Sequence, residues 1–310
     1  MKHYLSFDIG GTQIKFAVLT EHGEMVEKNS MDTAESGTQI ISDIVSVKTK
    51  LAEKYTLEGV AFSMPGFVDV NSGFLKTAGA IDDFFGINFK NIMVEKLSLP
   101  VELENDVNCV ALAEKWLGGA KHCEDFICIT IGTGVGGAIC VNGELVRGHS
   151  YMAGEFGYML TQNIFKVQDK ERSTMSHSAS VGHGLIKKYC NQQQVPLENM
   201  SGMDIYRLAE QGDQVALKVI EEFYQNIAIG LYNLTFILNP KKILIGGAIS
   251  GRDEIFPAIK AKFQEVFNGH ALLNQFLVDE FVCVESTQFK NDSGLIGALY
   301  HFLQMTMKRK

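Results

Sequence analysis

Two glycine-rich turns carry residue types that can bind a phosphate group. Residues 10–12 read GGT and follow an apolar run that contains Asp8, and residues 132–137 read GTGVGG. Glycine lets the backbone approach a ligand closely and exposes N–H groups to phosphate oxygens, and the hydroxyls of Thr12 and Thr133 add donors. Asp8 could orient water on a Mg²⁺ ion that bridges phosphates. The alternative is an aspartate that caps its own turn.

The G-x-G-x-x-G pattern of residues 132–137 does not indicate a dinucleotide site. Such a site needs a helix to begin at the third glycine, whereas the following residues, GGAICVNGELV, continue as a strand with a hairpin signal. The P-loop signature G-x-x-x-x-G-K-[ST] does not occur in the sequence. A further pair, Gly246 and Gly247, ends a predicted strand, where α/β folds bind ligands and an adenosine could lie.

Three polar residues outside the glycine turns are candidates for the chemistry. Asn105 and Asp106 stand between a predicted strand and a predicted helix, where either could be a helix N-cap. Asp106 could also accept the proton of an attacking hydroxyl, and Asn105 could hydrogen-bond a neighbouring one. Glu155 lies in a glycine-flanked segment and could bind vicinal sugar hydroxyls, or it could be a solvent-exposed loop residue.

The elements that would position these residues form a repeated pattern. Residues 4–31 predict strand, glycine turn, strand, hairpin turn and strand, and residues 125–148 predict the same order again. This repeat indicates two related α/β lobes. Helices are predicted at about 40–54, 105–119, 213–238 and 291–308, with further short strands at 59–66, 99–106 and 241–249. The polar stretch 161–180 is predicted to be a loop.

The composition narrows the classes of protein. The net charge is −8 without a basic block beyond the C-terminal MKRK, which argues against nucleic acid and anionic membranes as partners. We find no signal peptide and no apolar stretch long enough to span a bilayer, so a cytoplasmic protein is predicted. The six cysteines form no C-x-x-C pair, which favours free thiols and gives no zinc ligand cluster.

Six stretches together resemble the ROK family (repressors, open reading frames and sugar kinases). They occur in the family's order over nearly the whole chain: FDIGGTQIK, ENDVNCVALAE, ITIGTGVGGAI, AGEFGYM, ILIGGAI and NDSGLIGAL. The resemblance implies the actin-like, hexokinase-like fold, in which two α/β lobes of ribonuclease H-like topology flank a cleft. It implies a small lobe at 1–118 with the helix 292–310 packed on it, and a large lobe at 119–291.

The resemblance also implies an activity and a set of residues. Family enzymes transfer the γ-phosphoryl group of ATP, with Mg²⁺, to a sugar hydroxyl that is usually on C6. Asp106 matches the general base. The implied sugar-binding positions are Asn105, Glu155, Gly79, Ala80 and His177. The implied nucleotide-binding positions are Asp8, Gly10, Gly11, Thr12, Lys15, Gly132, Thr133, Gly134, Gly136, Gly137, Gly246 and Gly247.

One departure from the family pattern concerns zinc. Many members have a histidine where this chain has Tyr158, followed by a cysteine-rich zinc motif that is missing from RSTMSHSASVGHG. No zinc is therefore expected. The zinc-less branch that the chain most resembles phosphorylates the 6-hydroxyl of the non-reducing glucose in β-glucosides such as cellobiose. A glucokinase or an N-acetylmannosamine kinase of the same fold is the alternative.

Two other classes within reach of this fold are less favoured. A ROK transcriptional regulator would carry a helix-turn-helix before the first glycine turn, and Asp8 leaves no room for one. An actin-like assembly protein would not need Asp106 beside Asn105. The family resemblance further suggests a homodimer that acts on a small-molecule sugar.

Overall fold

The computed structural model describes residues 1–252 and 254–308. The chain divides into two compact units: unit 1 comprises Met1–His122, Arg147–Ala153 and Asn291–Lys310, and unit 2 comprises Cys123–Val146 and Gly154–Lys290. The segment Arg147–Ala153 belongs to unit 1, whereas the sequence analysis assigned it to the second lobe. Its contacts with residues remote in sequence decide this assignment, and no local pattern reports them.

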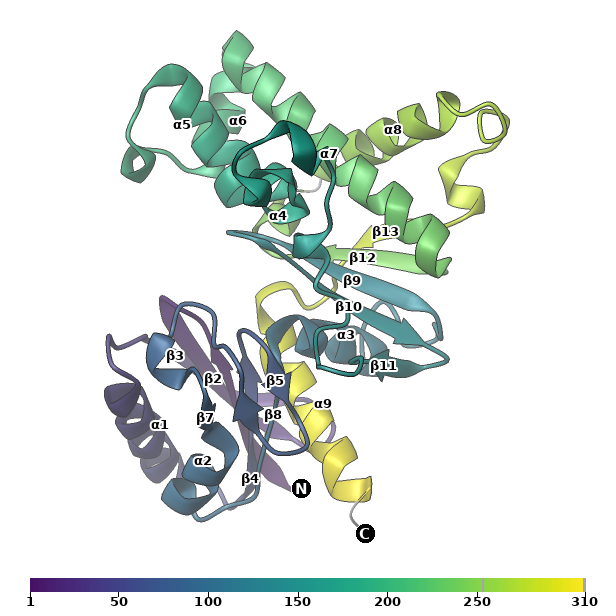
Figure 1. The fold of residues 1–310 in the computed structure, drawn as a ribbon. Coiled ribbons are helices and arrows are strands. Elements are labelled where there is room, and N and C mark those ends of the chain that lie inside the picture. Colours follow the sequence, from purple (N-terminus) through teal and green to yellow (C-terminus); the bar gives the residue numbers. More distant parts are fainter. Residues whose placement is uncertain (253, 309–310) are drawn as a thin grey trace. The chain divides into compact units, whose positions relative to one another are not determined.

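Unit 1 is built on a five-stranded sheet with the order β3-β2-β1-β4-β8 (Figure 1). The outer pairs β3-β2 and β2-β1 are antiparallel, and β1-β4 and β4-β8 are parallel. A small second sheet has the order β5-β6-β7. The strands are β1 (His3–Ile9), β2 (Gln13–Thr20), β3 (Met25–Asp32), β4 (Leu57–Met64), β5 (Val68–Asp69), β6 (Phe74–Leu75), β7 (Ile87–Asn88) and β8 (Val101–Asn105).

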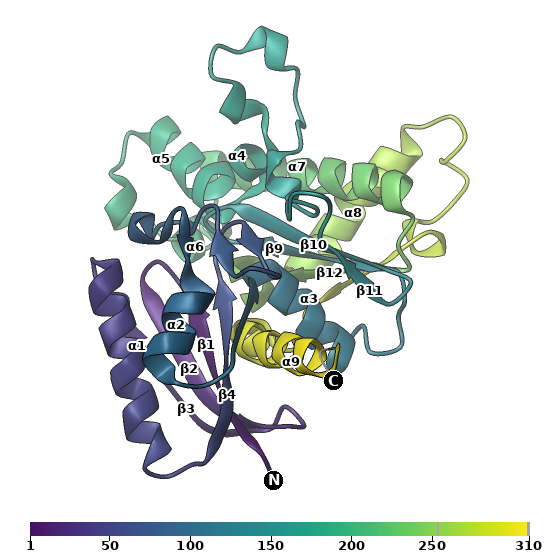
Figure 2. The ribbon, with the colours of Figure 1, turned by 60° about the horizontal axis from the view of Figure 1, so that its bottom comes forward.

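Helices cover both faces of the unit 1 sheet. Figure 2 shows α1 and α2 on one face and α3 and α9 on the other. Ser36 caps the first of these helices by accepting a hydrogen bond from the Gln39 N–H, as expected of a serine N-cap. The apolar sides of α1 and α2 pack with the strands in one core that includes Ile40, Phe62 and Phe89. The helices are α1 (Gly37–Ala52), η1 (Asp82–Phe84), α2 (Phe89–Leu97), α3 (Asp106–Trp116) and α9 (Ser293–Lys308).

Unit 2 repeats this strand arrangement. Its sheet has the order β11-β10-β9-β12-β13, with β11-β10 and β10-β9 antiparallel and β9-β12 and β12-β13 parallel. The strands are β9 (Phe126–Ile131), β10 (Val135–Val141), β11 (Glu144–Val146), β12 (Lys242–Gly246) and β13 (Cys283–Ser286). The repeated supersecondary unit predicted from the sequence is therefore present, and β10 is a strand where a dinucleotide site would need a helix.

A long helix dominates the helical layer of unit 2. Asp213 caps α7 (Gln214–Leu238) by accepting the N–H groups of Val215 and Ala216, and Asn239 ends it in the left-handed conformation. Its apolar side packs with α8 and the sheet in a core that includes Ile129 and Phe263. The other helices are η2 (Phe156–Tyr158), η3 (Ile164–Lys166), η4 (Lys170–Ser173), α4 (Met175–Ala179), η5 (Val181–Lys187), α5 (Lys188–Gln193), η6 (Leu197–Asn199), α6 (Gly202–Glu210), η7 (Ala248–Gly251), α8 (Ile255–Asn268), η8 (Val278–Glu280) and η9 (Lys290–Asp292).

The stretch 161–180 differs from the predicted loop. It contains η3, η4 and α4, and Thr174 is the N-cap of α4, with a side chain that accepts the His177 N–H. An isolated bridge pairs Leu160 with Thr174, and the Met175 N–H donates to the Met159 carbonyl at 2.8 Å. These contacts join residues about 15 positions apart, so a search for helical or strand periodicity does not detect them.

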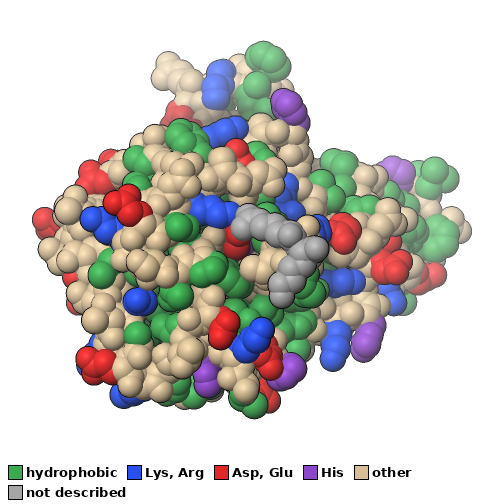
Figure 3. Space-filling model, turned by 90° about the horizontal axis from the view of Figure 1, so that it is seen from below, with side chains coloured by type: hydrophobic (Ala, Val, Ile, Leu, Met, Phe, Trp, Pro, Cys, Tyr) green, Lys and Arg blue, Asp and Glu red, His purple; other side chains and the backbone are tan. Residues whose placement is uncertain are grey.

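The described residues contain no helix with the length and apolar character needed to cross a membrane. On the face shown in Figure 3, basic and acidic side chains are interspersed rather than gathered by sign.

Candidate functional site

Asp8 lies near the end of β1 and has two polar neighbours on adjacent strands. The Ser63 hydroxyl of β4 donates to Asp8 Oδ1 at 2.7 Å, and Lys15 Nζ of β2 lies 3.6 Å from Asp8 Oδ2. The start of α9 packs against the same carboxylate, because a Cβ at Gly294 would lie 2.5 Å from Asp8 Oδ1. A helix N-terminus favours a nearby anion. These contacts hold the carboxylate in place, and it is half-buried rather than closed off from solvent.

The first glycine turn lies directly after Asp8. The Gly10 N–H donates to the Gln13 carbonyl at 3.1 Å, and the Thr33 hydroxyl donates to the Gly10 carbonyl at 2.6 Å. Within the described part of the chain, the exposed N–H groups of Gly11 and Thr12 have no hydrogen-bond partner. They can therefore donate to a phosphate oxygen.

Asn105 and Asp106 stand at the junction of β8 and α3. Asn105 is the N-cap: its Oδ1 accepts the N–H groups of Val107 at 2.9 Å and Asn108 at 3.0 Å, and its Nδ2 donates to the Gly66 carbonyl at 3.0 Å. The capping role was one of the two alternatives from the sequence. One Nδ2 hydrogen is left over, so capping does not exclude a hydrogen bond to a sugar hydroxyl.

Asp106 occupies the first position of α3 and is half-buried. Three carboxylates act on the buried thiol of Cys109 in the same helix. Burial, then the charges of Glu104, Asp8 and Asp106, raise the pKa of Cys109 well above its ordinary value. This shared influence puts the base candidate and the metal-linked candidate in one electrostatic neighbourhood, and it makes Cys109 a poor nucleophile.

The loop with Gly79 and Ala80 belongs to the same part of unit 1. A Cβ at Gly11 would lie 3.0 Å from the Ala80 Cβ, so the first glycine turn and this loop are neighbours. Gly79 has a φ of +60° and would bring a Cβ to 2.9 Å from Pro65, which explains the glycine. Unit 1 therefore brings together Asp8, the turn 10–12, residues 79–80, and the Asn105–Asp106 junction.

The second glycine turn joins β9 to β10 in unit 2. The Gly132 N–H donates to the Gly134 carbonyl at 2.9 Å, and the Ser176 hydroxyl accepts the Val135 N–H at 3.0 Å. The exposed N–H groups of Thr133 and Gly134 have no partner within the described residues, so this turn too can donate to phosphate oxygens.

Gly136 and Gly137 lie in β10 rather than in the turn, where the sequence analysis placed them. Gly137 is buried, and a Cβ there would meet the Phe156 ring and the Gly154 carbonyl. Its glycine thus permits the close approach of the segment that carries Glu155. That contact joins residues remote in sequence, so the G-x-G-x-x-G pattern alone could not reveal it.

Glu155 directly precedes η2 and is half-buried. Burial alone raises the pKa of its carboxyl above the ordinary value. Gly154 has a φ of +90°, and a Cβ there would lie 2.7 Å from the Gly137 carbonyl oxygen. This close backbone contact fixes the position of the backbone directly before Glu155. Within the part of the chain that the structure describes, Glu155 has no ion pair, and a half-buried carboxylate of this kind gains from hydroxyl donors.

Gly246 and Gly247 end β12 beside an apolar pocket. A Cβ at Gly247, whose φ is +85°, would lie 2.8 Å from the Ile131 backbone, so only glycine fits there. The next residues of η7 border a cavity of about 180 Å³. Its walls include Val181, Leu185, Met203, Tyr206, Ile249 and Arg252. The Arg252 guanidinium lies 4.4 Å from the centre of the Tyr206 ring, which closes one side with a cation–π contact.

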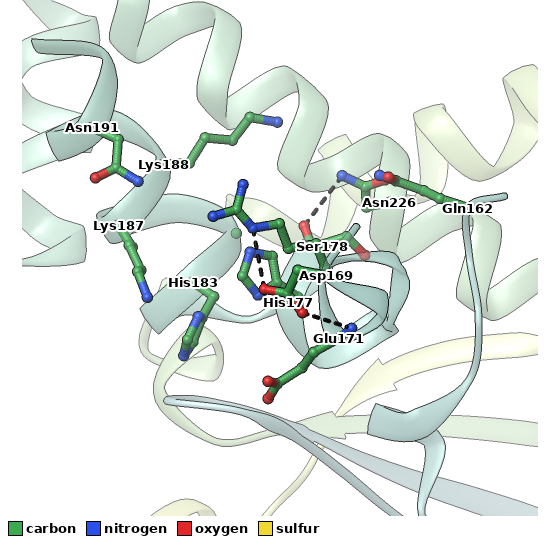
Figure 4. Close-up of a pocket in the computed structure, with 12 residues that line it drawn as sticks. Gln162, Asp169, Glu171, His177, Ser178, His183, Lys187, Lys188, Asn191 and Asn226 are labelled. Atoms are coloured by element: carbon green, nitrogen blue, oxygen red, sulfur yellow. Dashed lines mark hydrogen bonds and ion pairs between the residues drawn. The ribbon is translucent and has the colours of Figure 1, made fainter. Parts of the chain in front are cut away.

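His177 lies in a separate polar pocket of unit 2, of about 340 Å³ (Figure 4). Its ring centre is 5.0 Å from that of His183. Burial, then the positive charges of His183, Lys187 and Arg172, lower the pKa of His177, so its imidazole is neutral at pH 7. The remaining walls include the amides of Gln162, Asn191 and Asn226 and the Ser178 hydroxyl. Neutral imidazole, amide and hydroxyl groups can both donate and accept hydrogen bonds.

Several contributors were missed from the sequence. Ser63, Gly66 and Gly294 contact predicted site residues from strands and helices far away in the chain. The apolar pocket beside Gly247 draws on five separate elements. For these contacts the sequence held one signal, the pair Gly294 and Gly297 in NDSGLIGAL, because glycines at the start of a helix allow another segment to approach its backbone closely.

Comparison with known proteins assigns the family. The family model described as the ROK family matches residues 4–305. The chain belongs to the ROK family. A β-glucoside kinase of Listeria monocytogenes is 39% identical to this ROK protein over 300 residues, which cover 96% of this chain and 97% of the relative.

Solved structures match over the whole chain as well. A Listeria monocytogenes protein proposed to be an N-acetylmannosamine kinase has a TM-score of 0.87 at 38% identity, covering 98% of this chain and 99% of its own. A ROK-family glucokinase from Streptomyces griseus, solved with glucose and AMPPNP, has a TM-score of 0.81 at 26% identity, covering 97% and 99%.

These matches confirm three predictions from the sequence: the ROK resemblance, the actin-like and hexokinase-like fold class, and a carbohydrate kinase. Zinc stands differently. Residues 1–252 and 254–308 contain no group of three His, Cys, Asp or Glu side chains placed to hold a metal ion. The zinc-free site stays a prediction.

Proposed function

We propose that this ROK kinase transfers the γ-phosphoryl group of ATP to the 6-hydroxyl of the non-reducing glucose of a β-glucoside such as cellobiose. The Asp106 carboxylate accepts the hydroxyl proton, the freed oxygen bonds to the γ-phosphorus, and the bond from that phosphorus to the β–γ bridging oxygen breaks. ADP leaves with the electron pair. The products are ADP, the 6-phosphorylated β-glucoside and one proton, which Asp106 releases to solvent, so atoms and charge balance.

The observation that carries the proposal is the Asn105–Asp106 junction beside Asp8. A general base must reach the hydroxyl whose proton it removes. Asp106 projects from the first turn of α3, next to the capping amide of Asn105, which can orient a neighbouring hydroxyl. The influence of Asp106 and Asp8 on the same buried thiol supports a base and a metal-linked acid acting in one neighbourhood.

The residues of unit 1 fit a magnesium ion that arrives with ATP. Asp8 is a half-buried oxygen donor next to the unpaired N–H groups of Gly11 and Thr12, and Mg²⁺ prefers carboxylate, phosphate and water oxygens. Bound there, the ion would offset negative charge on the phosphates. We assign Asp8 the role of holding the ion's water, and Lys15 the role of orienting the Asp8 carboxylate.

The nucleotide proposal uses the uncharged end of the unit 2 sheet. The turn residues Thr133 and Gly134 offer amides to phosphate oxygens, and we assign the ribose to the end of β12 beside Gly246 and Gly247. The apolar cavity beside Gly247 suits a flat purine, because its walls are mostly aliphatic and its polar closure is the Arg252–Tyr206 stack. The AMPPNP-bound relative supports a nucleotide-binding family member.

The β-glucoside proposal adds the polar pocket around His177. We assign that pocket of unit 2 the second sugar or aglycone. The candidates for binding the glucose that is phosphorylated are Glu155 in unit 2 and, in unit 1, Asn105 and residues 79–80. A volume of about 340 Å³ and walls that donate and accept hydrogen bonds suit a hydroxyl-rich group. The β-glucoside kinase relative supports this choice. The N-acetylmannosamine and glucose kinases among the neighbours support the competing choice of a monosaccharide.

A substrate panel separates the two choices. Release of ADP would be measured with cellobiose, glucose and N-acetylmannosamine, each at concentrations that span its KM. We expect the highest kcat/KM with cellobiose. A higher kcat/KM for either monosaccharide would reject the β-glucoside assignment while leaving the kinase chemistry intact.

A homodimer is also proposed, from an apolar surface on unit 2. Phe236, Ile237, Leu272 and Leu277 are exposed, and the rings of Phe236 and Phe276 both contact the ring of Phe281. Apolar surfaces of this kind mark interaction sites. Light scattering on the full chain should report twice the mass of 34.3 kDa, and Ile237→Asp should return it to that mass.

A further inference from the structure

Glu104 is a fully buried carboxylate that directly precedes the proposed catalytic junction. It has 1% of its surface exposed and lies directly before Asn105, the last residue of β8. A buried carboxylate is costly unless hydrogen bonds and opposite charge compensate it. Glu104 takes no part in the proton and phosphoryl transfers proposed for Asp106, so its burial must have another reason.

Both carboxylate oxygens of Glu104 are occupied. Oε1 accepts the Asn105 N–H at 2.9 Å and Asn108 Nδ2 at 3.0 Å. Oε2 accepts Arg147 Nε at 2.7 Å and lies 2.6 Å from Arg147 Nη2. Burial acts to raise the pKa of Glu104, but Arg147, His301, Asn108 and the Asn105 N–H outweigh it and leave the pKa below its ordinary value.

The two donors that bond to Glu104 Oε1 lie on either side of Asp106 in the sequence. One donor is the backbone of the residue before it, and the other is the side chain of the residue two positions after it. Asn105 is itself the N-cap of α3, so the same carboxylate fixes the cap and the first turn. A shift of Glu104 would therefore move the backbone from which Asp106 projects.

The bonds to Oε2 hold Arg147, which begins the stretch of chain that precedes Glu155, another predicted sugar-binding residue. Arg147 begins the segment Arg147–Ala153, which is tied to unit 1 because Lys76 Nζ donates to the Ser150 carbonyl at 3.2 Å and Asn71 Nδ2 donates to the Tyr151 hydroxyl at 2.8 Å. The segment ends two residues before Glu155. The buried Glu104 carboxylate thus holds two segments of the chain: Asn105 itself, and Arg147, whose segment precedes Glu155 in the sequence.

We propose that Glu104 is a positioning residue for phosphoryl transfer, which fixes the Asn105–Asp106 junction through Oε1 and the Arg147 segment through Oε2. The inference rests on the proposed function of Asp106 as base. Glu104 does not touch the substrate. It acts by keeping Asp106 where the hydroxyl proton can be removed.

The neighbouring residue pair Lys90 and Glu102 provides a matched control. Glu102 lies two residues earlier on β8, is also 1% exposed, and its Oε2 is 2.6 Å from Lys90 Nζ of α2. Both glutamates are buried, ion-paired and on one face of one strand. Glu102 pairs toward α2, whereas Glu104 pairs toward the start of α3.

The test compares Glu104→Gln with Glu102→Gln. A glutamine keeps one acceptor oxygen but turns an amide donor toward Arg147 or Asn108, so the junction loses at least one bond. We expect kcat to fall by about 10- to 100-fold in Glu104→Gln, with KM values for ATP and sugar within about threefold, because a small displacement of a catalytic group has this cost. Glu102→Gln should unfold at lower denaturant but keep its kcat.

A milder pair of variants covers the case in which Glu104→Gln does not fold. Arg147→Lys keeps one charged donor for Oε2, and Arg147→Met removes it. We expect the loss in log kcat, relative to the wild type, to be at most half as large in Arg147→Lys as in Arg147→Met. Equal kcat losses in Glu104→Gln and Glu102→Gln, or an unchanged kcat in Glu104→Gln and Arg147→Met, would overturn the proposal.

Hydrogen exchange separates this inference from the proposed activity. Exchange of the amides of residues 105–108 should be faster in the Glu104 variant than in the Glu102 variant, whatever the sugar. If the wild type turns over none of the sugars, the proposed function fails, and equal exchange in the two variants would then reject the anchoring role as well.

Discussion

The two units end their sheets with the same geometry and different chemistry. In unit 1, Asp8 on β1 pairs in register with Ser63 on β4, and Ser63 pairs with Glu104 on β8. In unit 2, the position that matches Asp8 is Thr130 on β9, which pairs with Gly246 on β12. A carboxyl-rich end in one unit thus corresponds to an uncharged end in the other.

We propose that this difference gives the two units different roles in the phosphoryl transfer. The proposed base is Asp106 and the proposed metal-linked acid is Asp8. The Asp8 carboxylate has the Ser63 hydroxyl and the Lys15 ammonium as partners, and the buried Glu104 pairs with Arg147. A phosphate chain is itself anionic, so the surface that binds it gains from amides and loses from carboxylates. The two units share one strand arrangement, and we propose that the different residues at matching positions give them different roles.

Replacing the base should have the largest effect. Asp106→Asn should lower kcat by about 10²- to 10⁴-fold, since the amide cannot accept the proton in the transition state. Asp213→Asn is the control in unit 2, because Asp213 is also an aspartate at a helix start. Asparagine caps equally well, and its side-chain oxygen can still accept a hydrogen bond, although Asp213 also accepts the Tyr189 hydroxyl through Oδ2. Coupled-assay kinetics on both variants give the result. Near-normal turnover in Asp106→Asn would end the base assignment.

The acid at the end of β1 should rank second. Asp8→Asn should raise the Mg²⁺ concentration for half-maximal rate by roughly 10- to 100-fold, as removal of an outer-shell carboxylate does elsewhere. Titration of Mg²⁺ at saturating sugar measures the change. A variant whose Mg²⁺ dependence matches the wild type would leave Asp8 with a structural role only.

The comparison can be inverted by giving unit 2 a charge. Thr130→Asp places a carboxylate where Asp8 stands in unit 1, and we expect the KM for ATP to rise by about 10-fold or more through repulsion of the phosphates. Thr130→Asn has nearly the same size without the charge and should change it little. Similar KM values in the two variants would mean that phosphates do not lie near this strand end.

Backbone conformation gives a smaller, stability-based test. Gly247→Ala should cost about 1–3 kcal/mol of unfolding free energy, because alanine is strained at the observed φ and its Cβ meets the Ile131 backbone. Gly269→Ala is the control, since a Cβ there makes only ordinary contacts at 3.6 Å and 3.7 Å. Urea denaturation compares them, and equal losses would contradict the requirement for glycine.

The smallest effect concerns pH. The folded pKa of Glu155 lies above its unfolded value, so wild-type stability is lost as pH rises from the unfolded toward the folded pKa. Glu155→Gln should therefore stabilise the protein at neutral pH, and the gain should vanish in acid. Glu104 has a lowered pKa, so its stabilisation is present at neutral pH and lost as pH falls through the folded value.

Unfolding free energies between about pH 4 and pH 8 test both signs. Glu104→Gln should lose most stability at the upper end of this range, and Glu155→Gln should gain most there. Slopes of the same sign in the two variants would show that burial governs both carboxylates alike.

Local pattern in the sequence was enough for the repeated strand–turn–strand unit, the glycine turns and the helix that begins at Asn105, because alternation, turn residues and caps act within a few positions of the chain. Those same patterns left open whether Asn105 caps or binds, and they placed Gly137 in a turn. Tertiary structure decided these matters: Phe156 packs on Gly137, Arg147 joins unit 1 through Glu104, and Gly294 closes on Asp8. Each of these contacts joins residues far apart in the chain, and the free energy that selects them comes from burial and pairing, which no local period records.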